Sequence, residues 1–191
     1  MDHFSQSLPT FPVRTNTHGT RLYRLCRNCF LVIFLGVLFA QPGYSQISTY
    51  KIQSIFLYNF TKYVNWPQPG NTIVIGVVGD SDLMAELNAN LKGKKAGTKT
   101  FEIRQLNSTE EAAKCNLVYL PSVRSKELKE LMNIVKGKGV LIVTEEDLAD
   151  QGAGISFLQV EEKLRFKINS KVLKEAGLQA SSGLLGLAIV I

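Results

Sequence analysis

The chain has 191 residues, of which 45% are hydrophobic and 20% charged, as expected for one globular domain with a short additional segment. Its formal net charge is +6, but residues 1–45 hold four arginines and one aspartate, so residues 46–191 keep a net charge of +3, which does not favour nucleic-acid binding. Both histidines, His3 and His18, also lie in the first segment, which excludes histidine-based catalytic and metal sites from residues 46–191.

The N-terminal segment has the order of features of a secretory signal peptide. Four arginines precede residues 30–40, which carry no charge, and Gly43 and Ser45 are small residues just before a possible cleavage point at Gln46. The apolar run is shorter than the about 20 residues that a spanning helix needs. We expect residues 1–45 to be a cleaved signal peptide and residues 46–191 to be one exported domain. A membrane anchor is the less favoured alternative.

Residues 52–66 predict an amphipathic helix that ends near residues 65–66, because Pro67 disfavours helix in the residue before it. Residues at spacings of three and four share one face, which we expect to be buried: Ile52, Ile55, Phe56, Asn59, Phe60, Tyr63 and Val64. The other face is expected to meet solvent: Lys51, Ser54, Thr61 and Lys62.

The next part of the chain alternates between apolar and helical segments. Strands are predicted at residues 72–78, 101–106, 115–120 and 140–143, and helical segments at residues 82–91, 108–114 and 125–136, followed by a short acidic turn or helix at residues 145–148. Repetition of strand and helix with short connections is typical of a doubly wound α/β layer with a parallel sheet.

The C-terminal part has a different pattern. Residues 155–160 and 163–168 predict a hairpin joined by Glu161 and Glu162, whose second arm is an edge or near-edge strand with one basic face. Residues 169–176 predict a helix, and residues 181–191 are expected to dock as a short helix leading into a strand. The expected fold class is therefore α/β, with a mostly parallel sheet flanked by helices and a C-terminal antiparallel hairpin.

Two local features allow more than one interpretation. Cys115 is the one cysteine outside the leader, and we expect a buried thiol, with a redox-active or intermolecular thiol as the alternative. Residues 92–99 hold four lysines and are expected to be a solvated loop, although such a loop could touch an anionic surface. They lack the spacing of a phosphate-binding P-loop.

Six segments occur in the order and spacing of the YfiR family, which the chain resembles: residues 56–67, 73–80, 115–121, 139–145, 152–169 and 176–188. The resemblance implies a Rossmann-like fold, a periplasmic location and homodimers. It also implies a regulator without catalytic activity or a cofactor, which binds the periplasmic domain of a membrane sensor, namely a diguanylate cyclase in cyclic-di-GMP signalling or a histidine kinase. Cys115 matches a family cysteine but has no partner for an intrachain disulfide.

Two sets of candidate site residues follow. If the family mode holds, the partner-binding residues are expected on the first helix and its exit, on the hairpin arm and at the start of the tail: Tyr58, Asn59, Lys62, Trp66, Arg165, Asn169, Ser181 and Ser182. The alternative function is small-ligand binding at the carboxyl ends of the parallel strands, lined by Gly79, Asp80, Ser122, Thr144 and Glu145. For several of these residues a purely structural role is equally plausible, such as Ser181 as a helix cap.

Overall fold

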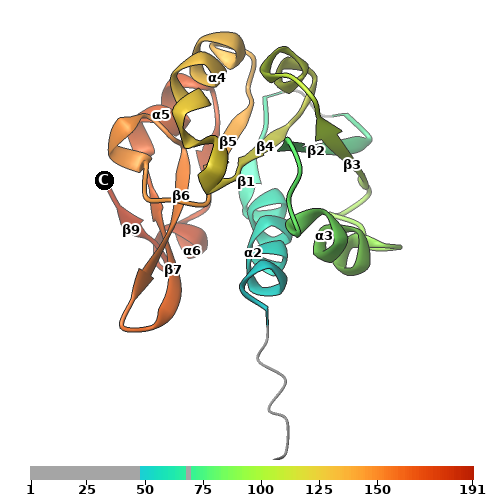
Figure 1. Cartoon of the computed structure of the whole chain (residues 1–191), viewed down its shortest axis with the longest axis horizontal. Helices are drawn as coiled ribbons and strands as arrows, with labels where there is room; N and C mark the ends of the chain where they lie inside the picture. The colour runs from blue at the N-terminus through green and yellow to red at the C-terminus, as the bar shows by residue number, and fades with distance from the viewer. Residues whose placement is uncertain (1–47, 68–69) are drawn as a thin grey trace, which may run out of the picture. The chain divides into compact units, whose positions relative to one another are not determined.

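The computed structural model describes residues 48–67 and 70–191. A seven-stranded sheet in the order β3-β2-β4-β5-β6-β7-β9 forms the middle layer (Figure 1). Its neighbouring strands are parallel except β6 and β7, which form an antiparallel hairpin. A hydrophobic cluster lies on each side of the sheet. The predicted fold class, a mostly parallel Rossmann-like α/β layer with a C-terminal hairpin, is confirmed.

The strands lie close to their predicted positions. Those of the large sheet are β2 (Thr72–Val78), β3 (Thr100–Leu106), β4 (Leu117–Leu120), β5 (Leu141–Thr144), β6 (Ile155–Val160), β7 (Lys163–Ile168) and β9 (Ile189–Val190). All four residues of β4 and of β5 are buried, because these central strands are covered on both faces. A second, two-stranded antiparallel sheet joins β1 (Val64–Asn65) to β8 (Gln179–Ala180).

The helices divide between the two faces of the sheet. One face is covered by α2 (Thr49–Tyr63), α3 (Leu83–Leu91), α5 (Ser170–Glu175) and α6 (Ser182–Leu185). The other face is covered by α4 (Leu128–Val135) together with the 3₁₀ helix η1 (Thr109–Lys114). Two further 3₁₀ helices are η2 (Ser122–Glu127) and η3 (Ala149–Gln151), so the helix predicted at residues 125–136 begins in 3₁₀ geometry.

Helix α2 ends earlier than predicted and presents a different face to the sheet. It stops at Tyr63, because Val64 and Asn65 pair with β8. Ser54 and Thr61, predicted to meet solvent, are buried. Their hydroxyls donate to the backbone carbonyls of the residues three positions earlier, at 2.8 Å for Ser54 and 2.6 Å for Thr61. Short hydroxyl side chains satisfied in this way can be buried without an unpaired donor.

The β6–β7 hairpin projects beyond the rest of the sheet (Figure 1). Strand β6 pairs with β5 only at Ile155 and Ser156, and β7 pairs with β9 only at Lys167 and Ile168. The prediction of a near-edge second arm is confirmed. Aromatic contacts fasten the hairpin to α2, since Phe157 lies with its ring centroid 5.9 Å from those of both Phe56 and Phe60.

Candidate partner-binding surface

Helix α2 carries an apolar stripe that the described residues leave uncovered. Ile55, Asn59 and Tyr63 follow one another at spacings of four, so they share one side of the helix. Ile55 is 44% exposed and Tyr63 is 47% exposed. The helix lies with α3 on one flank and α6 on the other (Figure 1), and its buried face points to the sheet. The stripe is therefore available for contact with another molecule.

Tyr58 and Lys62 lie together beside this stripe. The Lys62 ammonium is 5.3 Å from the centre of the Tyr58 ring and 5.7 Å from that of Tyr63. The Tyr58 hydroxyl donates to the Lys95 carbonyl at 3.2 Å, and its ring meets Phe101 edge-on at a centroid distance of 5.7 Å. Two of the predicted partner residues thus form a cationic and aromatic corner at the C-terminal half of α2.

Ser181 and Ser182 lie next to the end of α2. The Ser181 backbone N–H donates to the Tyr63 carbonyl at 2.8 Å, which joins the start of α6 to the end of α2. The Ser181 hydroxyl accepts from the Leu184 N–H at 3.3 Å and therefore caps α6. Ser182 is exposed. The structure brings both serines to the edge of the apolar stripe, and Ser181 also has the predicted capping role.

Trp66 lies away from this surface, beside Asn116 at the start of the internal strand β4. Its indole N–H donates to the Asn116 carbonyl at 3.0 Å, and its ring packs against the hydrophobic cluster on the α2 side of the sheet. Both contacts are structural. The sole tryptophan therefore anchors the chain as it leaves α2.

Arg165 and Asn169 are also separated from the stripe. Arg165 is exposed and lies opposite Leu158 in the hairpin, on the face that points away from α2. Asn169 caps α5, accepting from the Val172 N–H at 3.0 Å and donating to the Ala149 carbonyl at 2.9 Å. Of the eight predicted partner residues, Tyr58, Asn59, Lys62, Ser181 and Ser182 converge, whereas Trp66, Arg165 and Asn169 do not.

Ile55 and Tyr63 were predicted to be buried, but they are exposed, because the face of α2 that meets the sheet is rotated from the predicted one and is centred on Leu57. A different signal was present in the sequence. Gln53, Leu57, Phe60 and Val64 also recur at spacings of three and four, and they form the face that is buried. The helix has more apolar residues than one face can hold, which is itself typical of a helix with two contact faces.

The alternative ligand-binding edge exists, but its polar groups contact one another. Glu145 accepts a hydrogen bond from the Ser122 N–H at 2.8 Å and raises the pKa of the Tyr50 phenol by its negative charge. The buried Tyr119 hydroxyl donates to the Gln53 side chain at 2.9 Å, and burial raises the pKa of Tyr119 strongly. These contacts hold the N-terminal half of α2 to the ends of the strands.

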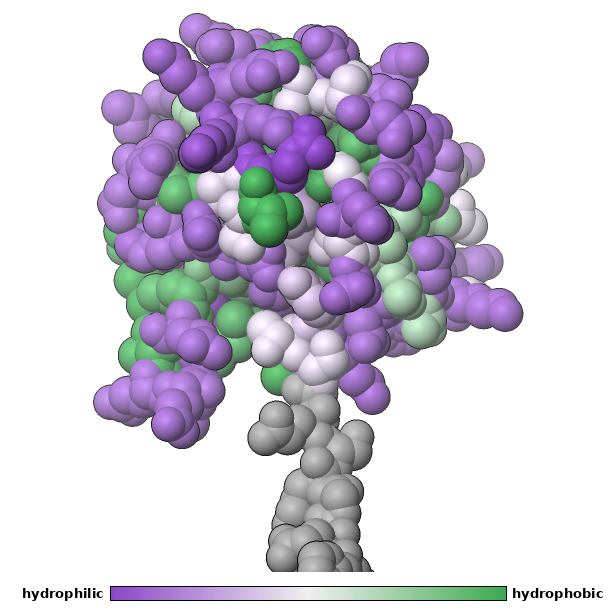
Figure 2. All heavy atoms as spheres, in the orientation of Figure 1, coloured by the Kyte–Doolittle hydropathy of each residue, from purple (hydrophilic) through white to green (hydrophobic). Residues whose placement is uncertain are grey.

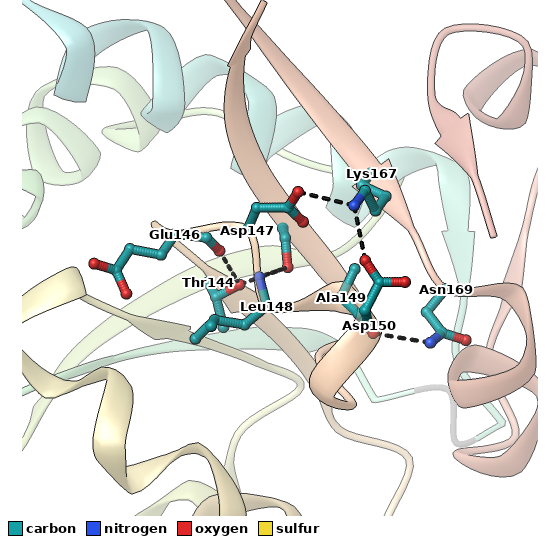
Figure 3. Close-up of polar contacts among 9 residues, drawn as sticks. Thr144, Glu146, Asp147, Leu148, Ala149, Asp150, Lys167 and Asn169 are labelled. Carbon is teal, nitrogen blue, oxygen red and sulfur yellow. Dashed lines mark hydrogen bonds and ion pairs between the residues drawn. The ribbon is translucent and has the colours of Figure 1, made fainter.

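Thr144 points away from the other residues of that edge. Gly79 and Asp80 follow the end of β2, as expected. The buried Thr144 hydroxyl instead forms hydrogen bonds with the Ser156 hydroxyl of the neighbouring strand β6 and with the Glu146 carbonyl of the turn after β5, each at 2.7 Å (Figure 3). The prediction that Thr144 lines a ligand site is therefore not supported by its contacts.

The same region holds an ion-pair network (Figure 3). The Lys167 ammonium contacts the carboxylates of Asp147 at 2.8 Å and Asp150 at 2.9 Å, and these two charges raise the pKa of Lys167. The basic face of β7 is therefore partly neutralised by the turn after β5. Within residues 48–67 and 70–191, no group of three or more Asp, Glu, His or Cys side chains is placed to hold a metal ion.

Cys115 is buried beneath the β3 side of the sheet, with 6% of its surface exposed. Burial raises the pKa of its thiol to about 11. A thiol with this pKa is protonated at neutral pH and is a poor nucleophile. The expectation of a buried thiol is confirmed, and the environment does not favour the redox alternative.

A search of curated proteins found no match. Among solved structures, the ABC domain in complex with L-Trp from Streptococcus pneumonia is 14% identical, with a TM-score of 0.46, covering 62% of this chain and 55% of its own. A conserved domain protein from Vibrio cholerae is 12% identical, with a TM-score of 0.47, covering 76% of this chain and 61% of its own. The chain thus spans less than two thirds of either structure, and neither likeness carries functional weight.

A family profile gives a more specific result. The profile described as YfiR/HmsC-like matches residues 50–189, which include β1 to β8 in full, the first residue of β9 and nearly all of α2. The match begins at the second residue of α2 and ends within β9, so it covers nearly all of the described chain. The chain belongs to the YfiR/HmsC-like family.

Proposed function

We propose that this protein is an exported regulator that binds the periplasmic domain of a membrane-bound sensor, such as a diguanylate cyclase, and thereby controls cyclic-di-GMP synthesis. The family assignment supports a periplasmic signalling role. The leader-like residues 1–45 agree with export, although they lie outside the described residues. No helix in the described part of the chain is long and apolar enough to cross a bilayer.

The observation that carries the proposal is the exposed stripe of α2. An apolar helix face flanked by polar groups is a common way for one protein to recognise another. Ile55 and Tyr63 supply the apolar contact, and Lys62 and Ser182 supply polar groups at its rim. The protein has no need of a catalytic group in this role, since binding alone can shift a sensor between active and inactive states.

The test uses the host of this protein with its gene deleted. If the protein represses a cyclase, deletion raises cellular cyclic-di-GMP, and the wild-type gene restores the original level. We expect an Ile55→Glu/Tyr63→Glu variant to fail in this restoration, because two charges would be desolvated in the interface. Cyclic-di-GMP is measured by mass spectrometry, and immunoblotting of the periplasmic fraction checks export and abundance.

Val123→Glu is the matched control. Val123 is 82% exposed and lies in η2, outside the exposed stripe of α2. This variant should restore cyclic-di-GMP as well as the wild type does. An unchanged cyclic-di-GMP level on deletion would contradict cyclase control, and full restoration by the Ile55→Glu/Tyr63→Glu variant would show that the stripe is not the docking surface.

Homodimerisation remains a prediction with a separate candidate surface. Exposed apolar residues gather at the β9 edge, namely Leu187, Ile189, Val190 and Ile191. Figure 2 shows this hydrophobic area beside the hydrophilic tip of the hairpin. If a second copy packs there, a Leu187→Glu/Val190→Glu variant sediments as a monomer where the wild type sediments as a dimer. Identical sedimentation of the two proteins as dimers would place the interface elsewhere.

A further inference from the structure

The loop after α3 concentrates positive charge on one edge of the molecule. Residues 87–101 contain four lysines and no acidic residue: Lys92, Lys94, Lys95 and Lys99. The first three are exposed and Lys99 is half-buried. Among the residues that the structure describes, none of the four forms an ion pair, whereas Arg104, Arg124 and Lys167 each pair with a carboxylate. We call these four residues the lysine loop.

Aromatic contacts hold the lysine loop against α2. The Tyr58 hydroxyl donates to the carbonyl of Lys95 at 3.2 Å. The Lys94 ammonium lies 5.1 Å from the centre of the Tyr58 ring, and the Lys62 ammonium lies 5.3 Å from the same centre. The Lys94 and Lys62 ammonium groups, both beside the Tyr58 ring, are therefore on the order of 10 Å apart or less, and at this distance they repel each other at low salt. An anion near both would relieve that repulsion.

The loop also borders a hollow with an apolar floor. A cavity of about 390 Å³ lies between the end of α3 and the edge strand β3, lined by Asn88, Leu91, Lys92, Gly93, Lys94, Lys95, Thr100, Phe101 and Ile103. Its apolar lining comes from Leu91, Phe101 and Ile103, and its charged rim comes only from lysines. A site of this kind suits a group that is anionic on one side and apolar on the other.

The basic residues of the lysine loop are lysines rather than arginines, and this indicates which kind of anionic partner the loop binds. Recognition of a particular carboxylate or phosphate in a protein partner favours arginine, whose planar guanidinium forms two parallel hydrogen bonds. The arginines of the described chain, Arg104, Arg124 and Arg165, all lie outside the lysine loop. Several lysines spread along a loop, with tyrosine beside them, are typical of attraction to the anionic surface of a bilayer.

We propose that the lysine loop binds the surface of a membrane that contains anionic phospholipids, with headgroups lying against the lysines and the apolar hollow facing the interfacial region. This contact is peripheral and reversible. It is independent of the partner-binding stripe, because it uses the loop after α3 and the β3 edge rather than the side of α2 that carries Ile55. Lys62, beside Tyr58, lies between the two surfaces.

The test measures binding of the protein, purified from its own host, to lipid vesicles. One set of vesicles contains phosphatidylglycerol and phosphatidylethanolamine, and the other contains phosphatidylcholine alone. We expect co-sedimentation with the first set at 50 mM salt, little with the second, and strong weakening at 500 mM salt. Replacing all four lysines by glutamine should lower the partition coefficient by a factor of about 100 or more, since each lysine near such a surface contributes roughly fivefold.

A matched variant replaces four exposed lysines on other parts of the chain: Lys129, Lys136, Lys138 and Lys171. Both quadruple variants have the same net charge and the same N-terminus, so a difference between them reports the position of the charges. Near-wild-type binding of the matched variant is expected. Equal losses in both variants, or equal binding to phosphatidylcholine, would overturn the proposal. Thermal unfolding of each variant confirms that it is folded.

Competition with a soluble acidic peptide distinguishes binding to an anionic membrane from binding to an acidic protein segment. Poly-glutamate should weaken vesicle binding only slightly at concentrations where it matches the charge of the lipid, because it offers no interfacial region for the hollow. Tight poly-glutamate binding that the lysine-loop variant loses, together with absent vesicle binding, would show that the loop recognises an acidic protein segment instead and would overturn the membrane assignment.

Discussion

The two edges of the seven-stranded sheet avoid pairing with other chains in different ways. Strand β3 is long and pairs with β2 at all seven of its positions, from Thr100 to Leu106. Strand β9 is short and pairs with β7 at two positions. An exposed edge invites pairing with other chains unless it is short, charged or covered. The β3 edge is long but carries Glu102 and Arg104 and lies beside the lysine loop, whereas the β9 edge is apolar but short.

This difference indicates how each side is stabilised. The β3 side depends on regular strand pairing and on close packing beneath it by Cys115 and Leu106. On the β9 side the hairpin pairs with each of its neighbouring strands at only two positions, so it depends on the aromatic contacts between the hairpin and α2. Figure 2 shows the corresponding contrast on the surface, with hydrophobic residues near β9 and mainly hydrophilic side chains over the α3 side.

Phe157→Ala should have the largest effect on stability. Phe157 is fully buried and contacts both Phe56 and Phe60, so its removal leaves a cavity between the hairpin and α2. We expect a loss of about 3–5 kcal/mol in the free energy of unfolding, measured by urea denaturation. Phe101→Ala, at the half-buried β3 edge, is the control and should cost about 1–2 kcal/mol. Equal losses would contradict the proposed dependence of the β9 side on aromatic packing.

Labelling of Cys115 should be strongly suppressed in the folded protein. Burial raises the pKa of its thiol from 9.0 to about 11, which lowers the thiolate population at pH 8 roughly 100-fold. A disulfide reagent should therefore react at least that much more slowly with the native protein than with protein in guanidinium chloride. Because the folded pKa is the higher one, this thiol also favours folding less and less as the pH rises above 9. Fast native labelling would show that the β3 edge opens readily.

Gly76→Ala should destabilise the β3 side by about 1–3 kcal/mol. A β-carbon at this position in β2 would lie 2.7 Å from the Cys115 sulfur and 2.7 Å from a Leu106 methyl, which is too close. Chemical denaturation measures the change. Gly183→Ala in α6 is the matched control, since nothing lies within 4 Å of its β-carbon, and it should leave stability unchanged or slightly improved. A neutral Gly76→Ala variant would show that the packing there is loose.

The smallest effect is expected at the hairpin turn, and it is a gain. Glu161 and Glu162 have φ values of 49° and 61°, in the left-handed region that a two-residue turn of this type requires. Asparagine and glycine tolerate this region better, so Glu161→Asn/Glu162→Gly should raise the free energy of unfolding by about 1 kcal/mol. Glu161→Gln/Glu162→Gln removes the charges alone and should change little. If the Glu161→Gln/Glu162→Gln variant gains more free energy of unfolding than the Glu161→Asn/Glu162→Gly variant, repulsion between the two carboxylates, not the backbone conformation, destabilises the wild-type turn.

Part of the candidate surface could be predicted from the sequence. The positions of Tyr58, Asn59 and Lys62 on the first helix followed from helical spacing, and Ser181 was expected as a cap. The clustering of these residues with Ile55 and Tyr63 could not be predicted, because the side of α2 that meets the sheet depends on its neighbours. Trp66 and Asn169 are polar or aromatic residues at element ends, where structural and functional residues have the same sequence signature.

The sequence alone determined the order of the strands of the large sheet and of most helices, the hairpin and the cap of α6, because these depend on periodicity and on contacts a few residues apart. The tertiary structure decided which face of α2 is buried, since the hydroxyls of Ser54 and Thr61 can be satisfied by their own helix and so permit close packing. It also decided that β9 joins β7 and that the lysine loop lies against Tyr58. These are contacts between residues distant in sequence, and their energies depend on the shape of the whole sheet.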